Sequence, residues 1–388
     1  MNTRRRQGIE RGAGGAPLRA PDVTTPVEEA TPAFRIARST RIHKYVLAVS
    51  VILVALLASG PFILQFVNGV LPVSTMRNLV TLFTLLALAQ MWNLLGGYAG
   101  LISVGQQAYI GLGAYGLWLL GDVLHLHPFL AVFLAGLLAV AVALPVAPLI
   151  FRLRGGYFAI GTWVVAEVVR LVVSNIQATG GGSGKTVISA ARLPIDTRIT
   201  GTYLLALFVA VGSILLVYFL LRSRLGLALT AIRDNDLAAQ SSGVNVFRSK
   251  LFVWVIAAYG CGVVGAVVAM NLLRIQPTAA FTVNWTAYMM FIVVIGGFGT
   301  IEGPIIGAVI YFALLQSLSQ YGTLYMLLLG IVAVIMVTLA PKGIWGYVAQ
   351  RWNLHLFPVR RRLVLESPPP EEDSKPADAP DAAVAESA

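Results

Sequence analysis

The chain has 388 residues, of which 57% are hydrophobic and 12% are charged. A soluble domain carries roughly twice that charged fraction, so these proportions exclude an ordinary soluble enzyme or binding module. The formal net charge of +11 does not indicate nucleic acid, because the basic residues lie in the tails and between apolar runs rather than on one face of a module. We therefore expect a protein embedded in the lipid bilayer, with no nucleic-acid partner.

Both ends of the chain are predicted to be polar tails. Residues 1–44 are Arg-rich and contain Gly and Pro, which predicts a disordered basic cytoplasmic tail. The end of this stretch, residues 34–45, alternates apolar and basic residues, and an amphipathic segment on the membrane surface is the alternative there. Residues 346–388 are predicted to be a second cytoplasmic tail, disordered from about residue 366, where Pro, Ala, Glu and Asp leave almost nothing to bury.

Ten apolar segments fill residues 45–345, the predicted transmembrane domain. Each is about long enough to cross the bilayer as a helix, which satisfies its own backbone hydrogen bonds. The segments are 45–67, 74–95, 98–120, 129–151, 156–177, 203–221, 251–273, 281–297, 304–319 and 324–340. We therefore predict an all-α, polytopic transmembrane helical bundle with about ten spans. The Gly-rich third segment, or one of the short last three, is a candidate for a broken or re-entrant segment.

The distribution of Lys and Arg predicts the orientation of these spans. If the N-terminus is cytoplasmic, 22 of the 28 basic residues fall in cytoplasmic pieces. The outer loops then hold only Lys185, Arg192, Arg198 and Arg274. We therefore expect both termini in the cytoplasm.

The longest interior hydrophilic stretch is residues 222–250, between the sixth and seventh segments. Three apolar residues at the spacing of one helical face are Leu225, Leu229 and Ile232. Residues 234–236 (Asp-Asn-Asp) can cap a second short helix over residues 237–242, which Gly243 ends. The sequence predicts two short helices joined by a polar turn. An ordinary loop on the bilayer surface is the alternative.

Four sequence blocks share one resemblance. Residues 223–245 read SRLGLALTAIRDNDLAAQSSGVN, and the others are NLLGGYAGLISVGQQAYIGLGAY (93–115), RGGYFAIGTWVVAE (154–167) and GGFGTIEGPIIGA (296–308). The order and content of these blocks resemble the LivM-type permease subunits of the branched-chain amino-acid ATP-binding-cassette (ABC) importer family. The first block departs from the family pattern at Leu227, where Arg is usual, and has Asp234 and Asp236 in place of Glu.

The resemblance implies a transport subunit of the bacterial inner membrane that is not an enzyme and binds no cofactor. It also implies a LivH-like second permease subunit, two ABC ATPase subunits that bind ATP and Mg²⁺, and a solute-binding protein outside the membrane. Residues 222–250 then correspond to the cytoplasmic coupling loop that docks on the ATPases. The resemblance assigns the contact with the ATPases to Ser223, Gly226, Ala228, Ala231, Ile232, Arg233, Asp234, Asn235, Asp236, Ala238, Ala239 and Gly243.

Polar and glycine residues in the second and fourth blocks are candidates for the solute path. The clustered glycines forbid a smooth helix, and a broken helix is tolerated where it is buried in protein or lines a water path. The candidates are Asn93, Ser103, Gln106, Gln107, Gly296, Gly297, Gly299 and Thr300. Tight helix packing without solute contact is the alternative, and we favour it for most of the glycines.

Glu167 and Arg170 are opposite charges deep in one predicted span, three residues apart, so they can pair on one helix face. Charged residues inside a span are costly and therefore suggest a functional role. For this pair we prefer the alternative, a structural ion pair. The outer loop ATGGGSGKT lacks the first glycine of a phosphate-binding loop, because Thr179 stands there. The family has a Thr-Gly-Gly motif at this place, so the resemblance implies that Thr179, Gly180 and Gly181 form a turn that faces the solute-binding protein. His125, His127 and Asp122 form too small a set for a metal site, so we predict none.

Three other functions stay open. A permease for amides or urea belongs to the same family. An ion-coupled secondary transporter would need several intramembrane carboxylates, and Glu167 is the one well inside a span. A membrane enzyme would need a cluster of His, Asp, Glu or Cys at one depth, and four scattered His with one Cys provide none.

Overall fold

The computed structural model describes residues 34–37, 41–66, 72–318, 324–339, 343–352 and 362–365. Of the predicted tails, 1–44 and 346–388, residues 1–33, 38–40, 353–361 and 366–388 lie outside the described residues. The chain divides into two compact units, and the smaller one contains an antiparallel pair of short strands. In it β1 (Phe34–Ala37) pairs with β4 (Arg362–Leu365), with Phe34 opposite Leu365.

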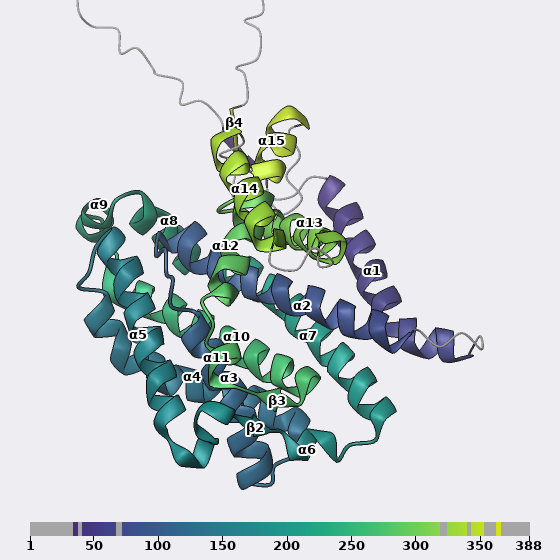
Figure 1. The fold of residues 1–388 in the computed structure, drawn as a ribbon. Coiled ribbons are helices and arrows are strands. Elements are labelled where there is room, and N and C mark those ends of the chain that lie inside the picture. Colours follow the sequence, from purple (N-terminus) through teal and green to yellow (C-terminus); the bar gives the residue numbers. More distant parts are fainter. Residues whose placement is uncertain are drawn as a thin grey trace, which may run out of the picture. The chain divides into compact units, whose positions relative to one another are not determined.

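The larger unit is helical (Figure 1). Its α-helices are α1 (Arg41–Phe66), α2 (Val73–Asn93), α3 (Gln107–Trp118), α4 (Pro128–Ile150), α5 (Gly156–Asn175), α6 (Ile188–Ala191), α7 (Ile195–Arg222), α8 (Arg224–Asp234), α9 (Asp236–Ser241), α10 (Val246–Leu272), α11 (Pro277–Ala280), α12 (Asn284–Gly296), α13 (Glu302–Leu318), α14 (Leu324–Leu339) and α15 (Gly343–Trp352). Single π-helical turns extend α2 over Leu94–Tyr98 and α3 over Leu119–Val123. The short 3₁₀ turns Gln177–Thr179 and Gly181–Ser183 precede β2 (Lys185–Thr186), which pairs with β3 (Arg274–Ile275).

The prediction of an all-α transmembrane bundle is confirmed. Every predicted apolar segment contains a helix, and within the described residues six helical stretches are long and apolar enough to cross a membrane. The third predicted segment, 98–120, is not one helix, because residues 100–106 are irregular before α3 begins. The eighth contains α12, whose 13 residues form a span-length stretch, Pro277–Gly296, only together with α11 and the irregular residues 281–283. The number of crossings therefore stays a prediction.

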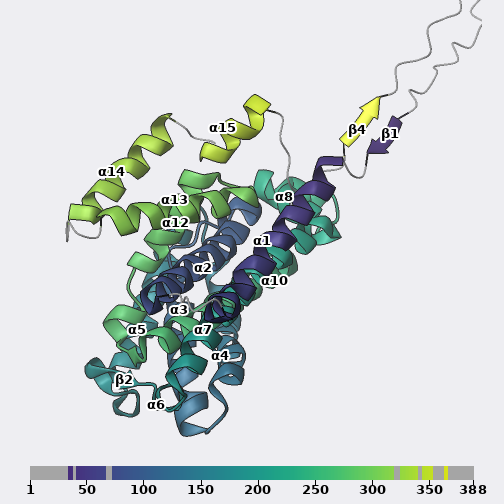
Figure 2. The same ribbon diagram turned by 90° about the vertical axis from the view of Figure 1, so that its right-hand side faces the viewer.

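Helix α10 lies at the centre of the larger unit, where it packs against α2, α3 and α4 (Figures 1 and 2). Glycines allow the closest of these crossings. A Cβ added to Gly113 would lie 1.8 Å from the carbonyl oxygen of Gly262, and one added to Gly265 would lie 2.0 Å from that of Ile110. Between membrane helices close approach through small residues replaces the hydrophobic driving force, so these glycines hold α3 against α10.

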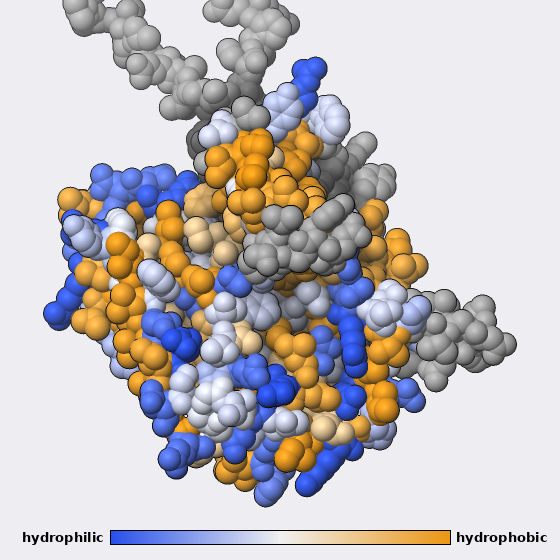
Figure 3. Space-filling model, viewed as in Figure 1, coloured by the Kyte–Doolittle hydropathy of each residue, from blue (hydrophilic) through white to orange (hydrophobic). Residues whose placement is uncertain are grey.

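The outer surface of the larger unit is apolar along several helices. On α4 the residues Leu130, Leu137 and Leu144 recur every seventh position and are about half exposed. Figure 3 shows hydrophobic residues across much of the visible face. An exposed apolar surface of this kind, on helices of membrane-spanning length, is the surface expected to face lipid. The chain is a multi-pass membrane protein.

Candidate functional site

The predicted coupling loop forms the two short helices α8 and α9, which confirms the sequence prediction. Ser223 caps α8 by accepting a hydrogen bond from the Leu225 backbone, and Asn235 caps α9 by accepting from Leu237 and Ala238. Of the three cap candidates at residues 234–236, the structure uses the asparagine. Gly243 follows α9 with a φ of 84°, as a helix-ending glycine should.

Helix α8 has one buried face and one exposed face. Leu229 and Ile232 are buried, whereas Leu227 is 72% exposed. On α9, Leu237 is 67% exposed and Ala239 is buried. Lys250 pairs with Asp236 at 2.6 Å and thereby joins the base of α10 to α9. Leu227 and Leu237 are thus exposed apolar side chains on an otherwise hydrophilic segment.

The side chain of Arg233 connects α8 to the transmembrane part of the chain. Its Nη1 donates to the carbonyl oxygen of Gly97 at 3.2 Å, in the π-helical turn after α2. Gly100, with a φ of 69°, passes close enough that an added Cβ would lie 3.4 Å from the Arg233 Cα. A residue with a side chain there would have a strained backbone, because its φ is positive. Sequence reasoning assigned Arg233 to the loop but missed this contact.

The Gly-rich turn between α12 and α13 lies against the same end of α2. Asn93 donates from Nδ2 to the Thr300 carbonyl at 2.7 Å and accepts from the Gly299 backbone N–H at 3.0 Å. Gln90 donates to the Ile301 carbonyl at 2.8 Å. Since these amides satisfy the backbone of a broken helix, the irregular turn is stable inside the bundle. The predicted path residues Asn93, Gly299 and Thr300 are thus brought together.

Glycines make this junction compact. An added Cβ on Gly97 would lie 2.9 Å from the Gly299 nitrogen, and one on Gly296 would lie 1.8 Å from the Gly303 carbonyl oxygen. Gly297 has a φ of 142° and touches the start of α15, because a Cβ on Gly343 would lie 2.5 Å from its Cα. We call the Asn93–Gly97 end of α2 together with residues 296–303 the glycine junction. Its glycines pack, as the alternative interpretation expected.

Two further path candidates are buried inside the bundle. Ser103 and Gln106 are both fully buried, and Gln106 donates to the Ser103 hydroxyl at 3.2 Å. Trp92 donates to the Ser103 carbonyl at 2.9 Å. The lone cysteine, Cys261, is also buried, and its Sγ lies 3.6 Å from the side-chain amide oxygen of Gln106. These residues support the irregular segment between α2 and α3.

The remaining path candidate, Gln107, lies elsewhere, in a cavity of about 310 Å³ between α3, α5 and the connection from α11 to α12. The cavity also contains the predicted pair of Glu167 and Arg170, whose proximity to Gln107 was not predicted from the sequence. Its lining is Gln107, Trp163, Glu167, Arg170, Thr278, Phe281, Thr282 and Val283. Irregular backbone at residues 281–283 forms one wall.

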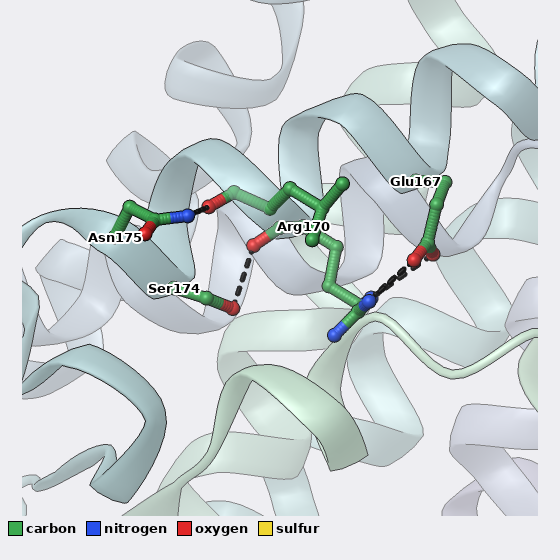
Figure 4. Close-up of polar contacts among 5 residues, drawn as sticks. Glu167, Arg170, Ser174 and Asn175 are labelled. Atoms are coloured by element: carbon green, nitrogen blue, oxygen red, sulfur yellow. Dashed lines mark hydrogen bonds and ion pairs between the residues drawn. The ribbon is translucent and has the colours of Figure 1, made fainter.

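Glu167 and Arg170 form an ion pair along α5 (Figure 4). The Arg170 Nε lies 3.0 Å from Oε1 and 2.9 Å from Oε2 of Glu167, and Nη2 also donates to this carboxylate. Ser174 and Asn175, one turn further along, instead donate to backbone carbonyls of their own helix. The pair is only partly buried, with 45% of the Glu167 side chain and 25% of the Arg170 side chain exposed.

The predicted outer loop at residues 178–186 forms a compact turn. Thr179 donates to the Val173 carbonyl at 2.7 Å, and Gly180 and Gly181 have positive φ values of 85° and 54°. Asp122 accepts hydrogen bonds from the backbone of Ile188 and Ser189 at the start of α6. Its carboxylate thus has a structural role, and within the described residues no group of three or more His, Cys, Asp or Glu could hold a metal ion.

Residues 74–337 match the family model described as the permease component of the branched-chain amino acid transport system. The chain is 29% identical over 339 residues to the high-affinity branched-chain amino acid transport system permease protein LivM of Escherichia coli (strain K12). That alignment covers 74% of this chain and 78% of the relative, and the LivM of Salmonella typhimurium (strain LT2) gives the same values.

A weaker similarity joins the chain to the ribose import permease protein RbsC of Haemophilus influenzae (strain Rd), at 28% identity over 210 residues. This alignment covers 49% of this chain and 64% of that relative. No solved structure matches the chain.

Proposed function

Because the chain belongs to the family of permease components of branched-chain amino acid transport systems, we propose that it carries branched-chain or closely related amino acids into the cytoplasm. It is the transmembrane permease subunit of an ABC importer. Energy for transport comes from ATP that separate ATPase subunits bind and hydrolyse. An external binding protein delivers the solute.

The contact between Arg233 and Gly97 carries the mechanistic part of the proposal. Helix α8 presents exposed Leu227 away from the bundle, and its Arg233 reaches the glycine junction. If the ATPases bind α8 and α9, a movement of these helices is transmitted to the end of α2 and to the turn after α12. Interlocked backbones with no room for a side chain move as a unit, so a shift of α8 reaches the bundle.

The exposed surface of α5 supports the proposal that a second permease subunit binds this chain. Only about a fifth of α5 is buried within the chain, and its exposed side chains include Ile160, Val164 and Val168 as well as Glu167. A charged pair inside a span does not face lipid tails favourably. We therefore propose that a LivH-like subunit covers this side of α5, and that the pathway runs between the two chains.

Uptake into proteoliposomes tests the proposed function. We expect the complex of this chain with its permease, ATPase and binding-protein partners to accumulate radiolabelled L-leucine when ATP is enclosed with the ATPases. ATP withdrawal should abolish uptake. Accumulation driven by a proton or sodium gradient without ATP would instead establish the ion-coupled alternative. Uptake of urea in place of leucine, isoleucine or valine would instead establish the alternative of an amide or urea permease of the same family.

Orientation is tested by cysteine labelling. The lone Cys261 is buried, so an introduced cysteine can be labelled without background from the native chain. We expect Ser242→Cys, just after α9, to react with a membrane-impermeant maleimide only after the cells are opened. Ser183→Cys in the outer loop is the matched control and should react in intact cells. The reverse pattern would place α8 and α9 outside the cell and refute cytoplasmic termini.

A further inference from the structure

The cavity that contains Gln107, Glu167 and Arg170 has no role in the coupling mechanism described above. Its volume of about 310 Å³ is at the lower end of the range for small-ligand pockets. The wall formed by residues 281–283 is irregular backbone within an apolar, span-length stretch. Non-helical backbone at membrane depth is tolerated where it is buried in protein or lines a cavity, and in transporters such breaks mark solute sites.

The cavity offers both donors and an acceptor. Within the part of the chain that the structure describes, Nη1 of Arg170 makes no hydrogen bond, and neither does Nε2 of Gln107, whose carbonyl accepts from Thr286. Gln107 is 98% buried, so its amide has only the cavity to face. The carboxylate of Glu167 is partly exposed and accepts from Arg170 alone.

The charges of the cavity sum to zero, because one carboxylate faces one guanidinium. A lone cation or anion would leave one protein charge unpaired inside a span, which is costly. A molecule with one ammonium and one carboxylate keeps the sum at zero and can bond both protein groups. Phe281, Val283 and Trp163 add an apolar surface beside these groups. The combination fits an α-amino acid with an apolar side chain.

We propose that this cavity is the chain's part of an intramembrane binding site for a zwitterionic α-amino acid. Arg170 and Gln107 bind the carboxylate, Glu167 binds the ammonium, and Phe281 with Val283 contacts the side chain. Between transport cycles the two protein charges neutralise each other. The inference rests on the proposed function and adds the residues that recognise the solute.

Interchanging the two charges tests this site. The double variant Glu167→Arg with Arg170→Glu keeps the i,i+3 ion pair and the zero net charge, so a purely structural pair would survive it. A solute-binding pair would not, since both solute groups then meet a like charge. We expect ATP-driven uptake of radiolabelled L-leucine by the full reconstituted complex to fall about 10- to 100-fold, the loss expected for one or two charge-assisted hydrogen bonds. Complex yield should stay within about twofold of the wild type, because the i,i+3 ion pair is retained.

Two further variants sharpen the result. The neutral double variant Glu167→Gln with Arg170→Gln should show the same loss, and Ser174→Ala, on α5 but outside the cavity lining, should show none. Equal uptake by the interchanged and wild-type complexes would overturn the inference and leave the proposed function intact. Failure of both double variants to assemble would make the pair structural and also overturn it. A wild-type complex that takes up no leucine, isoleucine or valine would overturn the proposed function together with the inference.

Discussion

Replacing Arg233 with alanine is expected to reduce ATP-driven solute uptake about 5- to 150-fold, the range of a typical coupling free energy between two sites. The guanidinium donates to the Gly97 carbonyl and lies against Gly299, where an added Cβ would be 3.4 Å from Nη1. Without it, α8 can still bind an ATPase, but its movement no longer reaches the glycine junction through this contact. Basal ATP hydrolysis should therefore persist while uptake falls, a separation measured on one reconstituted sample.

Arg224 provides the matched control for this experiment. It begins the same helix, is exposed, and its side chain makes no hydrogen bond within the described residues. Arg224→Ala removes one cationic side chain from α8 without touching the glycine junction, so uptake should stay close to the wild-type value. Equal losses for the two variants would show that positive charge on α8 matters rather than the contact with Gly97.

A methyl group at Gly113 is expected to destabilise the chain by about 3 kcal/mol, the upper part of the range for overpacked cores. The added Cβ would lie 1.8 Å from the Gly262 carbonyl oxygen, and backbone cannot turn away as a side chain can. We expect the apparent melting temperature of the detergent-purified Gly113→Ala chain to fall by roughly 5–10 °C, from the size dependence of thermal shifts.

Gly212 offers the same substitution in open space. It lies in α7, and an added Cβ there meets no atom within 4 Å. Because alanine forms helices better than glycine by about 1 kcal/mol, Gly212→Ala should leave the melting temperature unchanged or raise it slightly. A similar decrease for both variants would contradict the close crossing of α3 and α10.

Local features of the fold were predictable from sequence because their causes are local. The helix pair α8 and α9 follows from the spacing of Leu229 and Ile232 and from the Asn235 cap, all within one short segment. The positions of the long apolar helices follow from bilayer thickness for the same reason. The family resemblance rested on four such segments and agrees with the matched residues 74–337.

Contacts between distant segments were not predictable in this way. Asn93 was recognised as a polar residue in the membrane, but its partners Gly299 and Thr300 lie more than 200 positions away. Gln107 was grouped with Gln106, whereas the break before α3 directs the two into different surroundings. A broken helix leaves backbone N–H and C=O groups without hydrogen-bond partners inside the helix. The side chains that bind these groups are set by the tertiary fold, so a single sequence does not reveal them.

In the proposed mechanism α8 and α9 form the surface that an ATPase subunit binds from the cytoplasm. Leu237 is the exposed residue of α9 best placed to report it, and the buried Cys261 leaves the background unreactive. We expect Leu237→Cys in the assembled complex to form a cross-link to an ATPase subunit with a short bifunctional maleimide, and the yield to change when ATP binds. A cross-link to the external binding protein, or none to any ATPase in a complex that still transports, would contradict the account.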